Sequence, residues 1–208
     1  GYTYKAYVNN QLTNIYEYKG YVYNAAGQVT GYSRTDKDAQ GNVLVNYDYS
    51  GYTYFSDGKV QFYNRTDKDA LGSTIRSYDY SYNNAGQMAG YTYKAYTDGQ
   101  VTNIYNYSGY TYDANGKVVS YLRTDKDAQG NTLVNYAYQY SYYSNGTTQG
   151  YTRTDTDSSG NPLRAYNYNY NSNGQVSGYT YTAYTNGQVS GSNQYSGYTY
   201  NSDGKAVS

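Results

Sequence analysis

The sequence lacks several residue types on which common protein functions depend. It contains no cysteine, no histidine and no tryptophan, a single proline, and a single glutamate, Glu17. Without cysteine the chain can form neither disulfides nor thiolate metal sites. Without histidine or cysteine it cannot assemble the usual nucleophile–base pairs. We therefore expect a protein that is not an enzyme, with no catalytic and no cofactor-binding residues.

An excess of charge of either sign is also missing. Fifteen basic and fifteen acidic residues balance to a net charge of zero, and the basic residues form no block. Such a sequence has no electrostatic footprint for nucleic acid. No apolar run approaches the ~20 residues of a transmembrane helix. The chain starts at Gly1 without a methionine or a signal peptide, so we expect a mature or partial segment.

Tyrosine and glycine are abundant instead, with 39 and 23 residues among 208. Aromatic side chains fit a pleated sheet, and glycine supplies the positive φ angles of tight turns. Low mean hydropathy favours disorder, but the aromatic content and a strict periodicity oppose it. The composition therefore predicts strands and turns, with a core built from phenol rings.

Turn signals recur along the whole chain at spacings of 13 to 17 residues. This spacing suits strands of about ten residues joined by tight turns. The expected fold class is all-β: antiparallel β-hairpin tandem repeats, about seven hairpins of about 30 residues, in an elongated or coiled sheet of the solenoid, shell or fibre type. The turns are expected at Asn10, Gly27, Gly41, Gly58, Gly72, Gly86, Gly99, Gly116, Gly130, Gly146, Gly160, Gly174, Gly187 and Gly204.

A longer period is superimposed on the hairpins. GYTYKAY begins at residues 1 and 90, and GYTYTAY begins at residue 178, so the offsets are 89 and 88 residues. We expect one tandem-repeat array, 1–208, with long units 1–89 and 90–177 and a partial unit 178–208. Because the third unit is incomplete and a meander leaves open edge strands, the expected partners are copies of the chain, or a continuing repeat chain, in a fibre.

The strand after Gly41 shows how the tyrosines are distributed. Tyr47 and Tyr49 share one face because side chains alternate along a strand, whereas Tyr52 has the wrong parity for that face. A β-bulge at Ser50-Gly51 would add one residue and restore the phase. Bulges are predicted on the same grounds at Gly20, Gly51, Gly109 and Gly197.

Tyrosines at fixed positions after the turns are expected to form ladders across the sheet. Cross-strand aromatic pairs contribute roughly 0.2–1 kcal/mol each, so many of them could replace an aliphatic core. One ladder contains the residues six positions after a turn glycine: Tyr47, Tyr78, Tyr105, Tyr136 and Tyr166. The other contains the residues eight positions after it: Tyr49, Tyr80, Tyr107, Tyr138 and Tyr168.

The motif Asp-x-Asp-x-x-Gly occurs four times, in the RTDKD and RTDTD hairpins. It is similar to the start of an EF-hand calcium loop, which needs clustered oxygen ligands, but the closing glutamate is absent. The alternative is an Asp-rich hairpin turn with Asx hydrogen bonds. The candidate calcium ligands are Asp36, Asp38, Asp67, Asp69, Asp125, Asp127, Asp155 and Asp157.

Each of these motifs is preceded by an arginine, two residues before the first aspartate on the same face. Pairing with that aspartate, or stacking over a neighbouring tyrosine ring, is the expected role of Arg34, Arg65, Arg123 and Arg153. These aspartates recur through the array, whereas an active site is single, so they do not indicate the paired carboxylates of a glycosidase.

Two Asn-x-Thr sequons make Asn64 and Asn145 candidate glycosylation sites. The face that carries Thr, Ser and Asn could hold sugars more generally. Glycans are therefore candidate attached groups or partners.

Residues 110–140 read YTYDANGKVVSYLRTDKDAQGNTLVNYAYQY. This segment resembles the YD repeat of Rhs-type bacterial surface and toxin proteins, whose pattern is Tyr-x-Tyr-Asp-x-x-Gly-Arg and a hydrophobic residue. Lys117 takes the place of the arginine, and the matching residues are Tyr110, Tyr112, Asp113, Gly116 and Val118. The resemblance implies a shell of spiralling β-hairpins, an extracellular or cell-surface location, and a non-catalytic role.

The function that the sequence favours is a structural repeat segment of an extracellular filament or cell-surface protein. One alternative is a carbohydrate- or cell-wall-binding module, because residues 52–63 and 142–151 are similar to aromatic glucan-binding repeats, although those rely on tryptophan. Another is a shell fragment of an Rhs-type toxin. Tyrosines gathered in open grooves would favour sugar binding, whereas buried ladders would favour a structural role.

Overall fold

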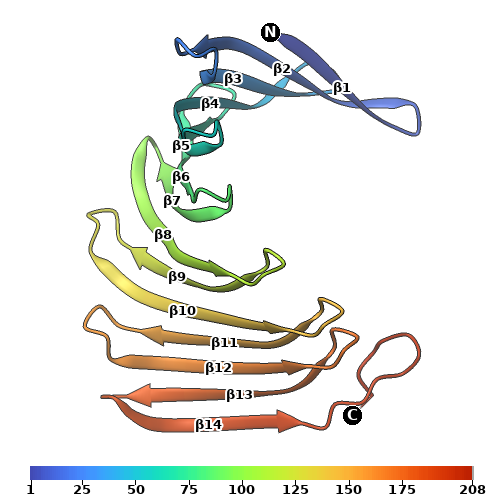
Figure 1. Cartoon of the computed structure of the whole chain (residues 1–208), viewed down its shortest axis with the longest axis vertical. Coiled ribbons are helices and arrows are strands. Elements are labelled where there is room, and N and C mark those ends of the chain that lie inside the picture. The colour runs from blue at the N-terminus through green and yellow to red at the C-terminus, as the bar shows by residue number, and fades with distance from the viewer. Residues whose placement is uncertain (208) are drawn as a thin grey trace. The chain divides into compact units, whose positions relative to one another are not determined.

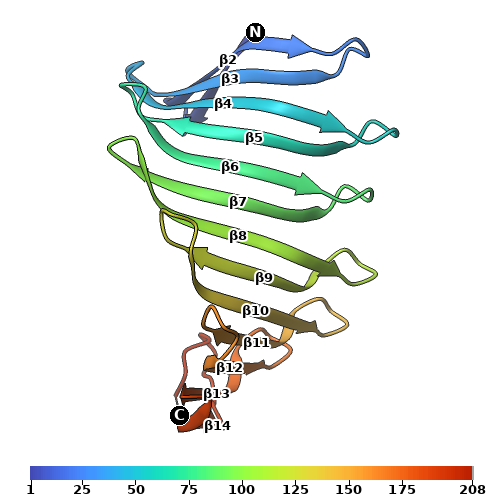
Figure 2. The same ribbon diagram turned by 90° about the vertical axis from the view of Figure 1, so that its left-hand side faces the viewer.

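The computed structural model describes residues 1–207, and its regular elements are fourteen β-strands (Figures 1 and 2). The strands form one open antiparallel sheet in chain order, β1 to β14. The residues described contain no helix. The predicted all-β hairpin repeat is therefore confirmed. All fourteen expected turn residues have positive φ, from 63° at Asn10 to 91° at Gly41.

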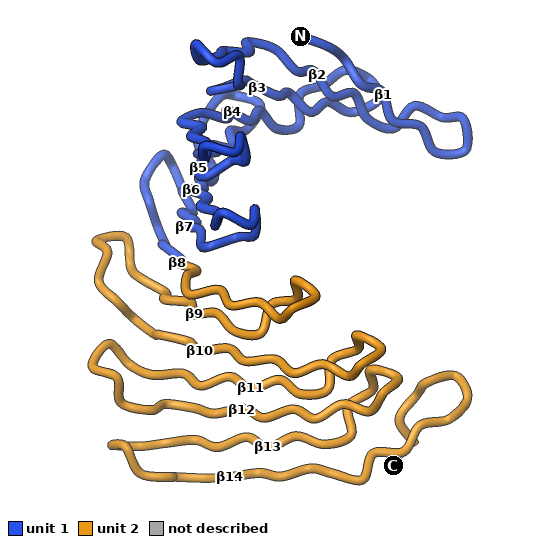
Figure 3. The backbone as a smooth tube through the Cα atoms, viewed as in Figure 1, with its two compact units in different colours: residues 1–105 blue, residues 106–208 orange. Residues whose placement is uncertain are grey.

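The chain is divided into two compact units, which are residues 1–105 (unit 1) and residues 106–208 (unit 2) (Figure 3). The boundary lies inside β8 (Gln100–Tyr112). Unit 1 contains β1 (Tyr2–Val8), β2 (Gln11–Tyr23), β3 (Val29–Asp38), β4 (Val43–Tyr54), β5 (Val60–Lys68), β6 (Thr74–Tyr82) and β7 (Met88–Thr97). Unit 2 contains β9 (Val118–Lys126), β10 (Thr132–Tyr142), β11 (Thr148–Thr156), β12 (Pro162–Tyr170), β13 (Val176–Thr185) and β14 (Gln188–Ser196). The organisation as one array over 1–208 stays a prediction.

Two turn geometries join the strands. After the TYKAY and TYTAY strands, both central residues have positive φ, as at Asp98 (50°) and Gly99 (73°), which is the type I′ pattern that matches strand twist. The other turns use three loop residues. In these the turn glycine donates its N–H to the carbonyl three residues earlier, as Gly41 does to Asp38 at 3.1 Å. Aspartate first and glycine fourth are the residues that a type I turn favours.

The predicted bulges restore the side-chain phase where strands pair on both sides of them. Lys19 pairs with Ser33 and Val22 with Gly31, so β2 has one residue more than β3 around Gly20, whose φ is 68°. The pairings around Gly51 have the same effect, because Ser50 pairs with Asn64 and Thr53 with Phe62, and Gly109 shares the positive φ, 64°. Tyr49 and Tyr52 both contact Tyr63, and Tyr107 and Tyr110 both contact Tyr121, each pair from one face. Gly197 also has positive φ, 78°, but lies beyond the end of β14.

Each unit is a single layer of strands with two different faces. The face that carries Tyr47 and Tyr49 in unit 1, and Tyr136 and Tyr138 in unit 2, is called here the tyrosine face; the opposite face carries Thr, Asn and Ser. Tyr138, 8% exposed, is the one hydrophobic residue that is buried among the described residues. The core is therefore a thin layer of ring-to-ring contacts on one side of the sheet.

Candidate functional site

The candidate site is a row of alternating tyrosine and arginine side chains on the tyrosine face. In unit 1, Arg34 on β3 and Arg65 on β5 flank Tyr47 on β4, with guanidinium carbons 5.0 and 5.4 Å from the ring centroid. In unit 2, Arg123 and Arg153 flank Tyr136 in the same way, at 5.1 and 5.5 Å. Cation–π stacking explains why a charged side chain is accepted within an aromatic row.

The tyrosines expected six positions after each turn are thus separated by arginines where the RTDKD and RTDTD strands intervene. Arg65 lies between Tyr47 and Tyr78, 4.3 Å from the centroid of the Tyr78 ring. Arg153 lies between Tyr136 and Tyr166, 4.2 Å from the Tyr166 ring. The TYKAY strand β7 and the TYTAY strand β13 place a tyrosine in this row instead of an arginine. The Tyr93 ring lies 5.0 Å from Tyr78 and 5.4 Å from Tyr105, and the Tyr181 ring lies 5.1 Å from Tyr166.

The tyrosines expected eight positions after each turn lie in a second row of rings, which is continuous within each unit. Their neighbours are tyrosines of the intervening strands, which the sequence analysis had not included. Tyr49 stacks on Tyr32 at 4.5 Å and Tyr138 stacks on Tyr121 at 4.4 Å, with interplanar angles of 10° and 11°. Other contacts of this row include Tyr63 to Tyr80 at 4.8 Å, Tyr107 to Tyr121 at 6.2 Å and Tyr151 to Tyr168 at 5.8 Å.

Burial in this second row makes the phenols harder to ionise. Desolvation raises the pKa of Tyr49 and of Tyr151 to about 12, because the phenolate would lose hydration among the rings. These side chains are therefore neutral hydrogen-bonding groups at physiological pH.

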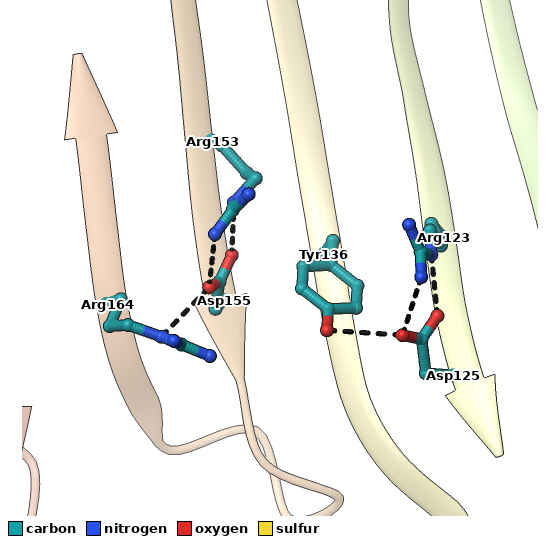
Figure 4. Close-up of polar contacts among 6 residues, drawn as sticks. All are labelled: Arg123, Asp125, Tyr136, Arg153, Asp155 and Arg164. Atoms are coloured by element: carbon teal, nitrogen blue, oxygen red, sulfur yellow. Dashed lines mark hydrogen bonds and ion pairs between the residues drawn. The ribbon is translucent and has the colours of Figure 1, made fainter.

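Each arginine of the first row binds the aspartate two residues further along its own strand. Arg123 donates from Nε and Nη2 to the two carboxylate oxygens of Asp125, at 2.6 and 2.7 Å, and the Tyr136 hydroxyl adds a bond of 3.2 Å (Figure 4). Arg153 holds Asp155 at 2.8 and 2.9 Å. Such two-point contacts are stronger and more directional than single ones. The pairs Arg34–Asp36 and Arg65–Asp67 have the same geometry.

A second arginine reaches two of these aspartates from the next strand. Arg76 on β6 lies 3.3 Å from Asp67, and Arg164 on β12 lies 3.2 Å from Asp155. Both aspartates are completely buried, whereas Asp36 and Asp125, which have one arginine each, are 13% and 16% exposed.

Sequence analysis had not singled out Arg76 and Arg164. A signal for them exists, because both lie four residues after a turn glycine, where the equivalent hairpins have Val45 and Val134. An arginine that replaces an inward-facing valine in half of the repeats indicates a partner of opposite charge on the neighbouring strand.

The second aspartate of each motif belongs to the turn and not to the arginine row. Asp38 Oδ1 accepts the backbone N–H groups of Gln40 and Asn42 at 3.0 and 2.8 Å, and Asn42 Nδ2 donates to Oδ2 at 2.7 Å. These hydrogen bonds lower the pKa of Asp38, and the bond from the Asn42 side chain has the largest effect. The same Asx turn is formed by Asp69, Asp127 and Asp157.

The two aspartates of a motif therefore lie in separate hydrogen-bond networks. Within residues 1–207 no group of three or more acidic side chains comes together in a way that could hold a metal ion. Calcium binding stays a hypothesis drawn from the sequence.

The two sequon asparagines lie in different surroundings. Asn145 is in an exposed turn, and its Nδ2 donates to the Ser172 carbonyl at 3.1 Å. Asn64 lies within β5, where its Nδ2 donates to Asp79 Oδ1 at 2.5 Å. Glycosylation at either residue stays a prediction.

Comparison with known proteins finds distant likenesses among solved structures. No family model matches the chain, and no curated protein matches it. A solved structure described as the crystal structure of TcdB2-TccC3 is similar at 15% sequence identity and a TM-score of 0.20. The match covers 88% of this chain and 14% of that chain, so this chain spans a small part of its length. A likeness this distant carries no argument, and the resemblance to YD repeats rests on the motif within 110–140.

Among the residues that the structure describes, there is no helix with the length and apolar character needed to cross a membrane.

Proposed function

We propose that this chain is a non-catalytic structural segment of an extracellular filament or cell-surface protein, and that its tyrosine face supplies cohesion. The observation that supports this most is the pairing of Arg with Asp on the tyrosine face, in the same geometry in all four RTDKD and RTDTD hairpins. Groups that could act as acids, bases or ligands are engaged with one another, and the arrangement recurs with the repeat. A reaction centre would instead be formed once.

Self-association is part of the proposal. Within the described residues most tyrosines of the tyrosine face are only half-buried, so much of this ring surface is still in contact with water. Removing apolar surface from water is worth about 25 cal/mol per Å². Contact with further copies, or with further repeats of a longer chain, would supply that gain.

Edge strands offer a second route to association. β1 has one pairing partner, β2, and it carries the exposed tyrosines Tyr2, Tyr4 and Tyr7. Its one charged residue is Lys5 and it contains no proline, so this edge has little of the usual protection against pairing with another chain.

The experiment that tests the proposal combines electron microscopy with light scattering on material from the native source. Filaments or assemblies heavier than the 23.4 kDa chain are expected at neutral pH. A Tyr4→Lys variant, which places a charge on the edge strand, should reduce assembly through that edge. A monodisperse particle of 23.4 kDa from the native source would contradict the proposal. Antibody labelling of intact cells tests the surface location separately.

A further inference from the structure

Two hollows in the tyrosine face recur at the long period of the sequence. The hollow in unit 1 has a volume of about 540 Å³ and the hollow in unit 2 about 530 Å³. Their shared lining positions differ by a constant offset of 88 residues. In unit 1 these are Tyr52, Val60, Tyr63, Tyr82 and Gly86, and in unit 2 they are Tyr140, Thr148, Tyr151, Tyr170 and Gly174. Recurrence in both units makes the hollow a property of the repeat.

Three tyrosines on successive strands form the wall of each hollow. In unit 1, the Tyr63 ring lies 4.9 Å from Tyr52 and 6.2 Å from Tyr82, with interplanar angles of 9° and 14°. In unit 2, Tyr140 and Tyr151 lie 5.2 Å apart, with a larger angle of 43°. In unit 1 the nearly parallel rings cover one another's faces, so what they offer to a ligand is largely ring edge and hydroxyl.

The turns beside the hollows are fastened to each other. Lys59 Nζ donates to the Asn84 carbonyl at 2.9 Å in unit 1, and Thr147 Oγ1 donates to the Ser172 carbonyl at 3.1 Å in unit 2. These two contacts join positions that are again 88 residues apart. In unit 2 the Tyr143 hydroxyl also donates to the Tyr170 carbonyl at 2.7 Å. The hollows are therefore formed before a ligand arrives, as small-molecule sites usually are.

The chemistry of the lining is uncharged. No lining side chain in either hollow is ionisable near neutral pH. The turn glycines Gly86 and Gly174, with φ of 83° and 79°, add no side chain to the space. Phenol rings combine an apolar body with a hydroxyl that donates and accepts. A ligand of matching chemistry is neutral, ring-shaped and rich in hydroxyl groups.

We propose that the two hollows bind neutral pyranose rings, so that one chain carries two equivalent glycan sites. This goes beyond the structural role, since the tyrosines would serve cohesion through their faces and recognition through their edges. Two sites on one chain also raise the apparent affinity for a polymer that can reach both.

The test is calorimetric titration of the full chain with maltohexaose, cellohexaose and laminarihexaose, and with hexagalacturonate as the charged control. At least one neutral hexasaccharide is expected to bind at two sites per chain, and the anionic one to show no binding. Tyr82→Ala and Tyr170→Ala should each reduce the number of sites from two to one. The double variant should bind roughly tenfold more weakly or not at all.

Matched controls separate recognition from folding. Tyr181→Ala removes a tyrosine of the same face that packs against Tyr166 and lines neither hollow, and should keep two sites. Val60→Trp and Thr148→Trp fill the hollows without removing a ring, and should abolish binding with the circular dichroism unchanged. Absence of binding by all three neutral sugars at millimolar concentration, or two sites persisting in the double variant, would overturn the proposal. The structural role is read separately by electron microscopy.

Discussion

Substitution of Asp67 by asparagine should destabilise unit 1 more than the same change at Asp36. Asp67 is fully buried and has two arginine partners, Arg65 at 2.7 Å and Arg76 at 3.3 Å. Asp36 is 13% exposed and has Arg34 alone. The substitution at Asp67 leaves two guanidinium groups without a counter-charge, and the substitution at Asp36 leaves one.

The magnitude follows from the burial of the partners. Removing one member of a buried ion pair costs about 3–5 kcal/mol. Arg65 and Arg76 are 24% and 41% exposed, so water offsets part of this, and we expect about 2–3 kcal/mol for Asp67→Asn. About 1–2 kcal/mol is expected for Asp36→Asn, where one charge is left and solvent is closer.

The assay is urea unfolding followed by tyrosine fluorescence, with hydrogen exchange of β5 and β6 measured by mass spectrometry. Exchange is needed because repeat proteins open locally, so one global transition can hide the effect. Arg76→Val in the Asp67→Asn background recreates the Val45 environment and should recover part of the loss. Equal destabilisation by Asp67→Asn and Asp36→Asn, or a loss below about 0.5 kcal/mol at Asp67, would refute the reasoning.

Three further predictions concern pH and the backbone. Because the folded state raises the pKa of Tyr49 and Tyr151 to about 12, it keeps protons that the unfolded chain releases near pH 10. The melting temperature should therefore be constant from neutral pH to about pH 10 and fall between pH 10 and 12, and a flat profile over that range would count against buried rings. Because the pKa of Asp38 is lowered from 3.8, its stabilisation should be present above pH 4 and lost on further acidification, an effect that Asp38→Asn should reduce in an acid titration followed by circular dichroism. Gly51→Ala should lower stability by about 1–2 kcal/mol in urea, since φ is 66° there, whereas Gly191→Ala, at an ordinary φ with no atom within 4 Å, should change it by less than half of that.

The elements of this fold follow from local sequence. Strands, turns and bulges depend on residues close together in the chain: alternation of side chains, a glycine that reaches positive φ, and aspartate at the start of a turn. Gly20 and Gly51 show this most clearly, because a break in parity within one strand sufficed to predict each bulge. Local rules work here because every strand pairs with strands adjacent in the sequence, so register is set by the connecting turn.

Contacts between side chains of different strands were decided by the tertiary structure. Sequence reasoning aligned Tyr47 with Tyr78, but the strand between them places Arg65 in that row. Similarly, Asp36 and Asp67 lie in near-identical motifs, yet only Asp67 is completely buried, because Arg76 faces it from β6 where Val45 faces Asp36 from β4. Burial and ion pairing depend on what the neighbouring strand presents at the same level, and the hollows depend on three strands and a turn together. Local residue patterns define the repeat and its turns, whereas the pairing of strands in space defines which side chains meet.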